Sequence, residues 1–163
     1  MRTVSSDFLI VGAGVIGNAI AYHLARQGCR VLVIDRADVA SEPAASWASA
    51  GGVRRQGRHP AEARLASEAI ARWPSLSAEL EADLHYRQGG NLLVAETENE
   101  ADGLADFVRE QHRMGFTDVR LLDRQEIHEL APALSQHIVA GSYSPADGQA
   151  DPQIGRASCR ERV

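Results

Sequence analysis

A glycine-rich segment between two apolar runs restricts the fold of this chain more than any other feature. Residues 7–11 form a run of strand length, and Gly12-Ala13-Gly14-Val15-Ile16-Gly17 follows at once. We expect a helix over residues 18–27 and a second strand over residues 31–34 that ends on Asp35. The order strand, G-x-G-x-x-G, helix, strand and acid is that of a dinucleotide-binding βαβ unit.

Each glycine of the motif has a physical role. Gly12 lets the chain turn tightly out of the first strand, Gly14 leaves room for a pyrophosphate against the backbone, and Gly17 lets the helix pack closely on the sheet. The helix N-terminus offers unpaired N–H groups and a partial positive charge to the phosphates. Asp35 can accept hydrogen bonds from an adenosine ribose. Neighbouring residues complete this set of candidate cofactor-binding positions: Val15, Ile16 and Arg36.

Bulk properties exclude several classes of protein. A length of 163 residues is that of one domain, and a net charge of −5 gives no support for nucleic-acid binding. The first apolar run is too short for a signal-peptide core or a membrane span. Cys29 and Cys159 are the only cysteines, so no disulfide framework is indicated and we expect a cytoplasmic location. The scattered histidines show no metal-ligand spacing, so we expect no metal site.

Downstream of the βαβ unit the pattern changes. Residues 44–52 are small and glycine-bearing, which suits close approach to a ligand but equally an ordinary loop, and residues 53–59 are locally basic. Residues that recur at helical spacing predict an apolar stripe on a helix that Pro74 kinks or ends: Leu65, Ala69 and Trp73 at a spacing of four, with Ala66 and Ile70 beside them. Further elements are expected in this order: helical character over 75–84, two short strands within 86–95, a helix over 98–114, a strand over 119–122, a helix capped by Asp123 that runs to Leu130, and a strand over 138–143.

This order of elements predicts an α/β fold. A plain NAD Rossmann domain would continue its βαβ pattern at once, whereas this chain leaves it after the second strand. That favours an FAD-binding, Rossmann-like start interrupted by an α+β substrate domain. We expect the first part of the FAD-binding domain at 1–83, the start of the substrate domain at 84–150, and a return to the FAD-binding domain at 151–153.

Residues 154–163 differ from the rest of the chain. They have no apolar periodicity, and they interrupt a helix start that Asp151 and Pro152 predict. A natural basic tail is the plain alternative, but the segment resembles the translation of a common short-read sequencing adapter, whose preceding bases complete a codon for Gln153. We therefore expect that this tail is not biological, that Cys159 has no role, and that the C-terminal remainder of the parent protein is missing.

The assembled pattern resembles the D-amino acid oxidase family of FAD-dependent oxidoreductases, closest to its sarcosine oxidase β-subunit and glycine oxidase branch. The likeness covers almost everything before Ile154. It is carried by these segments: residues 10–17, Ala21-Tyr22-His23-Leu24-Ala25, residues 31–36, Ser46-Trp47-Ala48-Ser49-Ala50-Gly51-Gly52-Val53-Arg54-Arg55-Gln56, Tyr86-Arg87-Gln88-Gly89-Gly90, Leu92-Leu93-Val94-Ala95 and Asp147-Gly148-Gln149-Ala150-Asp151-Pro152.

The resemblance implies FAD as the cofactor and particular roles for several residues. Arg54 matches the arginine that grips the substrate carboxylate in sarcosine oxidase relatives, and Arg55 is a near alternative. Many family members carry glutamate where Asp35 stands, so a role for NAD stays open. The loop that would run beside the flavin's diphosphate and ribityl chain contributes these candidate residues: Ser46, Ala50, Gly51 and Gly52. Some relatives have a second arginine at the position of Gly51, so the substrate stays open.

The implied reaction is oxidation of a small amine or amino acid, such as sarcosine, glycine or a D-amino acid. Hydride passes to flavin N5, the imine product hydrolyses, and oxygen or an electron acceptor reoxidises the flavin. Other subunits are possible partners. An NAD(P)-dependent dehydrogenase and a non-catalytic nucleotide-binding module remain the alternative functions.

Overall fold

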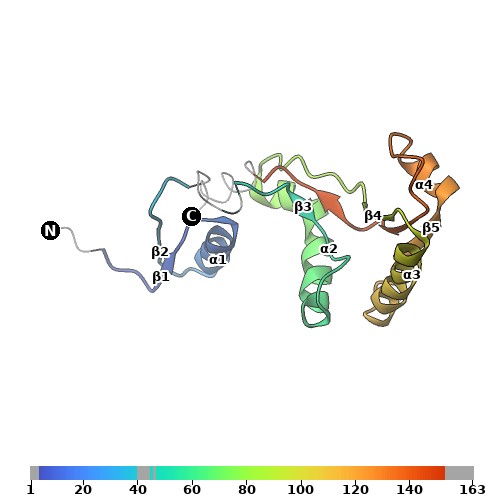
Figure 1. The fold of residues 1–163 in the computed structure, drawn as a ribbon. Coiled ribbons are helices and arrows are strands. Elements are labelled where there is room, and N and C mark those ends of the chain that lie inside the picture. Colours follow the sequence, from blue (N-terminus) through green and yellow to red (C-terminus); the bar gives the residue numbers. More distant parts are fainter. Residues whose placement is uncertain (1–3, 40–44, 46, 153–163) are drawn as a thin grey trace. The chain divides into compact units, whose positions relative to one another are not determined.

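The computed structural model describes residues 4–39, 45 and 47–152 as a mixed α/β chain in two compact units (Figure 1). Of these residues, unit 1 takes those up to Gly52 together with 74–86 and 150–152, and unit 2 takes 53–73 and 87–149. Ser46 and the tail at 154–163 lie outside the described residues. The assignment of the two units to an FAD-binding and a substrate domain is a proposal.

Unit 1 contains the predicted βαβ unit. Strand β1 (Phe8–Val11) pairs in parallel with β2 (Val31–Ile34), with Phe8 opposite Val31, and helix α1 (Val15–Arg26) connects them. Both expected strands are confirmed. The helix begins three residues earlier than expected, because Gly14 is its N-cap and Asn18 N–H already donates to the Gly14 carbonyl at 3.0 Å. The last residues of the glycine motif therefore form the first turn of the helix.

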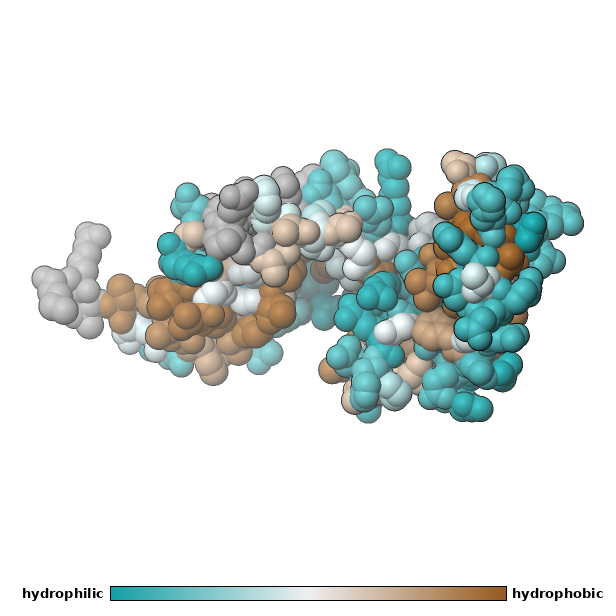
Figure 2. Space-filling model, viewed as in Figure 1, coloured by the Kyte–Doolittle hydropathy of each residue, from teal (hydrophilic) through white to brown (hydrophobic). Residues whose placement is uncertain are grey.

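The surface of unit 1 is strongly apolar around β1, β2 and α1, and Figure 2 shows it in brown. The following large apolar residues are exposed: Phe8, Leu9, Val11, Val15, Ile16, Ile20 and Ile34. Parallel strands are normally covered on both faces by other elements. This sheet has only two strands among the described residues, so its apolar side chains lack that cover.

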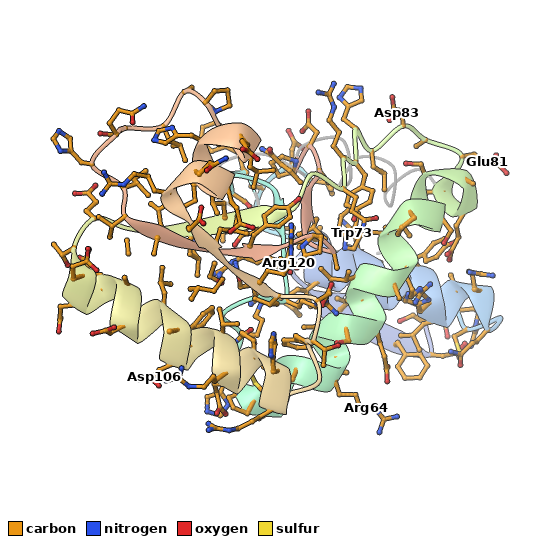
Figure 3. All side chains as sticks on the ribbon, turned by 90° about the vertical axis from the view of Figure 1, so that its right-hand side faces the viewer. Arg64, Trp73, Glu81, Asp83, Asp106 and Arg120 are labelled. Atoms are coloured by element: carbon orange, nitrogen blue, oxygen red, sulfur yellow. The ribbon has the colours of Figure 1, made fainter. Side chains whose placement is uncertain are left out.

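Helix α2 (Ala63–Leu80) follows a short 3₁₀ turn, η1 (Pro60–Glu62), and continues through Pro74. Pro74 therefore does not end the helix. The expected stripe is confirmed only in part: Ile70 is buried and Ala66 and Trp73 are half-buried, whereas Leu65 is 70% exposed and Ala69 is exposed as well. The covered positions of the helix are Ala63, Ala66, Ser67, Ile70, Trp73, Leu76, Ser77, Glu79 and Leu80. A strict spacing of four drifts around a helix that has 3.6 residues per turn. Figure 3 shows Arg64 extending into solvent from this helix, and its side chain is 91% exposed.

Unit 2 is built on an antiparallel sheet in the order β4 (Asn91–Ala95), β6 (Ala140–Ser144), β5 (Arg120–Asp123). The second strand expected within 86–95 is absent, because Arg87 forms only an isolated bridge with Gln149. Strand β5 starts one residue later than expected and β6 two residues later. Two short strands, β3 (Gly52–Val53) and β7 (Gly148–Gln149), lie where the chain passes between the units.

Two helices pack on this sheet, and both begin with a capping box. Thr97 caps α3 (Glu98–Arg113), and Asp123 caps α4 (Arg124–Leu130) as expected. The α3 side of the core contains Ala63, Val108, Phe116 and Val119, and the α4 side contains Leu122, Ile127 and Ile138. No helix in the described part of the chain is long and apolar enough to cross a membrane.

We expect Ile127→Ala to destabilise unit 2 by about 2–5 kcal/mol, because Ile127 is fully buried and its removal leaves a cavity. Leu130→Ala on the same helix is the control, since Leu130 is 45% exposed and its truncation leaves no enclosed void. Denaturant midpoints of the two variants test this. Equal midpoints would contradict the assignment of Ile127 to the core.

Candidate functional site

The glycine turn of unit 1 is held by close backbone packing. Gly12 has a φ of 107°, and its N–H donates to the Ile34 carbonyl at 2.8 Å, which ties the turn to the end of β2. A side chain on Gly17 would overlap the Gly12 carbonyl oxygen and would lie 3.4 Å from Ile10 Cγ2. Helix α1 therefore meets the end of β1 at a distance that only glycine allows at position 17.

The peptide groups of Ala13 are held from two sides. Ala13 N–H donates to Asp35 Oδ2 at 2.6 Å, and the buried Asn18 donates through Nδ2 to the Ala13 carbonyl at 2.8 Å. The sequence analysis did not identify Asn18. Asparagine is a poor helix-interior residue whose side chain readily bonds to nearby backbone groups, so its place near the start of this helix could have indicated such a bond.

Asp35 is exposed and accepts a second backbone bond from Ala37 N–H, at 3.1 Å to Oδ1. Hydrogen bonding from Ala13, and secondly from Ala37, holds the pKa of the Asp35 carboxyl below its ordinary value. Since the ionised form makes these bonds, their stabilising effect is complete above the ordinary carboxyl pKa. It is lost as the pH falls through the lowered pKa.

A pocket of about 330 Å³ lies beside this turn in unit 1 and brings together Ala13, Asn18 and Asp35 with Val31 and Val33 of β2. The first turn of α1 carries no acidic side chain, and Val15 and Ile16 are exposed there. The N-terminus of the helix can therefore receive an anion without competition from its own residues. An apolar wall, a carboxylate and a free helix start are the groups that a dinucleotide requires. Arg36 is exposed directly after Asp35.

Among the small residues after Trp47, Gly51 has a structural explanation of its own. Gly51 has a φ of 73°, its carbonyl accepts a bond from Ala150 N–H at 3.0 Å, and a side chain there would overlap the Ala150 carbonyl oxygen. Glycine at position 51 is therefore required by the protein's own chain. Ala50 and Gly52 are exposed, and a side chain on Gly52 would meet no atom within 4 Å.

The two candidate arginines differ in how exposed their side chains are and in what those side chains contact. The Arg55 side chain is only 14% exposed, pairs with Asp118, and lies 4.9 Å above the ring of Phe116. Arg54 is exposed, and its Nη1 donates to the Gln56 carbonyl at 3.2 Å. Arg55 is thus an internal anchor of unit 2, whereas Arg54 presents its guanidinium at the surface.

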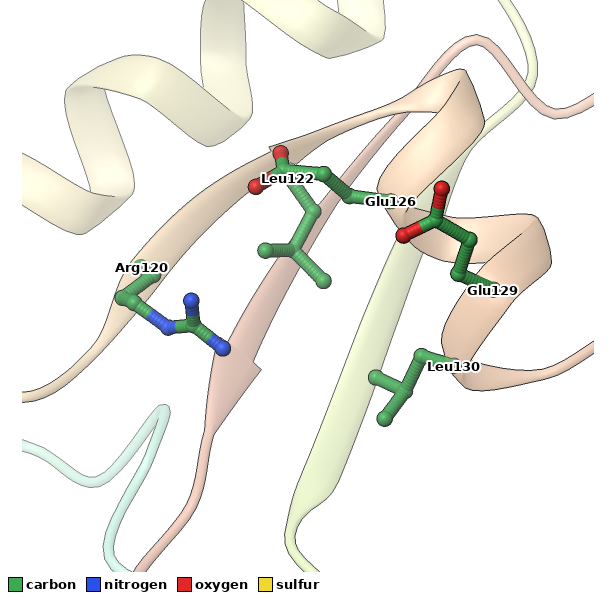
Figure 4. A pocket seen from close by; sticks show the side chains of 5 residues that line it. All are labelled: Arg120, Leu122, Glu126, Glu129 and Leu130. Atoms are coloured by element: carbon green, nitrogen blue, oxygen red, sulfur yellow. The ribbon is translucent and has the colours of Figure 1, made fainter.

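A second pocket, of about 310 Å³, lies in unit 2, and none of the predicted site residues lines it (Figure 4). Arg120 of β5 and Glu129 of α4 stand on different sides of it. Its polar groups have structural roles, because Glu126 accepts the Asp123 N–H bond of the capping box and Arg120 lies 5.8 Å from the Tyr143 ring. Among the described residues no group of histidine, cysteine, aspartate or glutamate is arranged to hold a metal.

Comparison with known proteins gives consistent relatives. Glycine oxidase of Geobacillus kaustophilus is 34% identical over 151 residues, which cover 88% of this chain and 39% of that protein. Mitochondrial dimethylglycine dehydrogenase of Rattus norvegicus is 28% identical over 153 residues, covering 90% of this chain and 17% of that protein. The crystal structure of the Geobacillus kaustophilus glycine oxidase superposes with a TM-score of 0.87 at 31% identity, covering 96% of this chain and 44% of that one.

An opine oxidase component from Rhizobium meliloti is a further relative, 34% identical over 157 residues that cover 89% of this chain and 41% of that protein. The chain therefore spans less than half the length of these relatives. Residues 7–154 match the family model described as DAO, FAD dependent oxidoreductase. That range includes the glycine turn, Asp35 and both candidate arginines. The chain belongs to the DAO family of FAD-dependent oxidoreductases.

Proposed function

We propose that the protein carrying this chain oxidises a small amine or amino acid with FAD as its cofactor. The main support for this proposal is the glycine turn of unit 1. Asp35 and Asn18 hold the turn by hydrogen bonds, and it lies beside a pocket and a helix start without acidic side chains. The family match supports FAD over NAD(P) and over a non-catalytic module. FAD, when bound, would accept hydride from the carbon next to the substrate nitrogen.

The protein's share of this reaction is binding and orientation. The amides at the start of α1 would hold the pyrophosphate, and Asp35 would accept the hydroxyls of the adenosine ribose with its remaining lone pairs. Gly12, Gly14 and Gly17 would shape that site, and Arg36 would flank it. The loop residues Ala50, Gly51 and Gly52, with Ser46 outside the described part, are proposed to follow the flavin's diphosphate and ribityl chain.

Arg54 is proposed as the ligand of the substrate carboxylate. Its exposed guanidinium has five N–H donors in a fixed planar arrangement that matches a carboxylate with two parallel bonds. Arg55 is a poor alternative as the carboxylate ligand, because its guanidinium is already paired with Asp118. The substrate class also accords with the names of the relatives, which include a glycine oxidase and an opine oxidase.

A cytoplasmic location and association with other subunits are proposed as well. The first proposal rests on the sequence, whose two cysteines indicate no disulfide framework. The opine oxidase relative is named as one subunit of its enzyme, which supports an assembly here. Oxygen or an electron acceptor would reoxidise the flavin.

We expect Gly14→Asp in the full-length protein to weaken FAD binding by roughly 100-fold or more, because two like charges about 4 Å apart repel by about 4 kcal/mol near a protein surface. The fold should survive, since Gly14 is the N-cap of α1 with φ −74° and ψ −176°, a position that aspartate favours. The measurement is the FAD dissociation constant by flavin fluorescence.

Gly103→Asp provides the matched control for this experiment. Gly103 lies on the exposed face of α3, and a side chain there would meet no atom within 4 Å. The control should bind FAD like the parent protein. Full FAD content in the Gly14→Asp variant would contradict the proposal that the pyrophosphate binds at the glycine turn.

We expect Arg54→Ala to raise KM for a carboxylate-bearing substrate by about 10–100-fold, because the variant loses charge-assisted hydrogen bonds worth about 1.5–3 kcal/mol. FAD content should not change, and Arg54→Lys should recover part of the loss. Arg64→Ala, which removes an exposed arginine of α2, is the control and should behave like the parent. An unchanged kcat/KM in the Arg54→Ala variant would show that Arg54 does not bind the substrate and is an ordinary solvated surface charge.

A further inference from the structure

A fully buried carboxylate lies beneath the segment that carries Arg54. Asp147 accepts Arg55 N–H through Oδ1 at 2.9 Å and Gln56 N–H through Oδ2 at 3.2 Å. Its own main-chain carbonyl accepts Gly90 N–H at 2.8 Å, just before β4. One residue in the turn after β6 thus holds two consecutive amides that lie more than ninety positions earlier in the chain.

Gln56 fixes the same segment from the other side. It is fully buried, and its Nε2 donates to Asn91 Oδ1 at 2.9 Å and to the Asn91 carbonyl at 3.2 Å. Its Oε1 accepts a bond from Ser142 Oγ at 2.6 Å. The amide side chain therefore connects the segment to β4 and β6, an edge strand and the central strand of the sheet.

The neighbouring residues are fixed as well. Arg55 is anchored by Asp118 and Phe116, and Gly57 N–H donates to Gln111 Oε1 of α3 at 3.2 Å. The side chains of Arg55 and Gln56 and the backbone N–H of Gly57 therefore each contact a different part of unit 2. Arg54 itself remains at the surface, and its guanidinium donates a hydrogen bond to the Gln56 carbonyl.

This arrangement suits the positioning of a binding group better than stability alone. Burying a carboxylate costs free energy that an apolar residue of similar size would avoid, and Asp147 recovers it through backbone amides in one fixed geometry. Binding groups act best when a rigid outer layer of hydrogen bonds fixes them. We propose that Asp147 is the positioning residue that orients Arg54 toward the substrate carboxylate, with Gln56 as its partner; this rests on the proposed function of Arg54.

The test is Asp147→Asn in the full-length holoenzyme. The amide has the shape of the carboxylate, but its NH₂ group cannot accept, so one of the two backbone N–H groups loses its partner. We expect amide hydrogen exchange at residues 55–56 to accelerate at least about 10-fold. The KM for a carboxylate substrate should rise by about 3–30-fold, with kcat within about 2-fold and FAD content unchanged.

Asp123→Asn is the matched control. Asp123 also lies in unit 2 and accepts a backbone N–H, that of Glu126 at 2.9 Å, but it caps α4 and does not contact the Arg54 segment. Asparagine caps helices as well as aspartate does, so KM and the exchange at residues 55–56 should match the parent. Should Asp147→Asn fail to fold, Ser142→Ala removes one bond to Gln56 and should raise KM by about 2–5-fold, the loss of one hydrogen bond of modest net strength.

The outcomes separate the two proposals. If Arg54→Ala raises KM but neither Asp147→Asn nor Ser142→Ala does, the positioning role of Asp147 is overturned and the role of Arg54 stands. If Arg54→Ala leaves KM unchanged, the proposed substrate ligand fails, and the inference fails with it. Faster exchange at residues 55–56 without any change in KM would make Asp147 a structural residue only.

Discussion

The peptide groups on either side of Ala13 are fixed before any ligand is bound. Asp35 accepts the Ala13 N–H, Asn18 donates to the Ala13 carbonyl, and the Gly12 N–H is tied to the end of β2. Helix α1 then starts directly at Val15, with no acidic side chain in its first turn. A loop whose shape is already set loses less entropy when it binds, so these contacts favour tight binding of an anion at the helix start.

Unit 2 uses the same physical device for a different purpose. In unit 1 the exposed Asp35 carboxylate holds the glycine turn, and in unit 2 the buried Asp147 holds the backbone after Arg54. In both cases a carboxylate accepts backbone N–H groups from a distant segment and leaves the proposed binding group accessible. This division accounts for the contrast between the anchored Arg55 and the exposed Arg54.

Local patterns predicted the local elements, and long-range contacts escaped them. The strands β1 and β2, the helix α3 and the Asp123 cap follow from short-range periodicity and capping chemistry. The buried stripe of α2 was predicted in part: Ile70 is buried, but Leu65, which starts the spacing of four, is exposed. The contacts of Gln56 and Asp147 join residues far apart in sequence, so nothing in either segment reveals them. Glycine at position 51 was expected beside the flavin, and its close approach to the Ala150 carbonyl is a separate reason for glycine there that the sequence did not reveal.

We propose that the glycine turn of unit 1 holds the pyrophosphate of FAD. A crystal structure of the full-length protein with FAD bound would show whether it does. We expect pyrophosphate oxygens within hydrogen-bond distance of the amides at Val15 and Ile16, and the adenosine ribose hydroxyls within hydrogen-bond distance of the Asp35 carboxylate. A pyrophosphate bound elsewhere, with the start of α1 open to solvent, would contradict it.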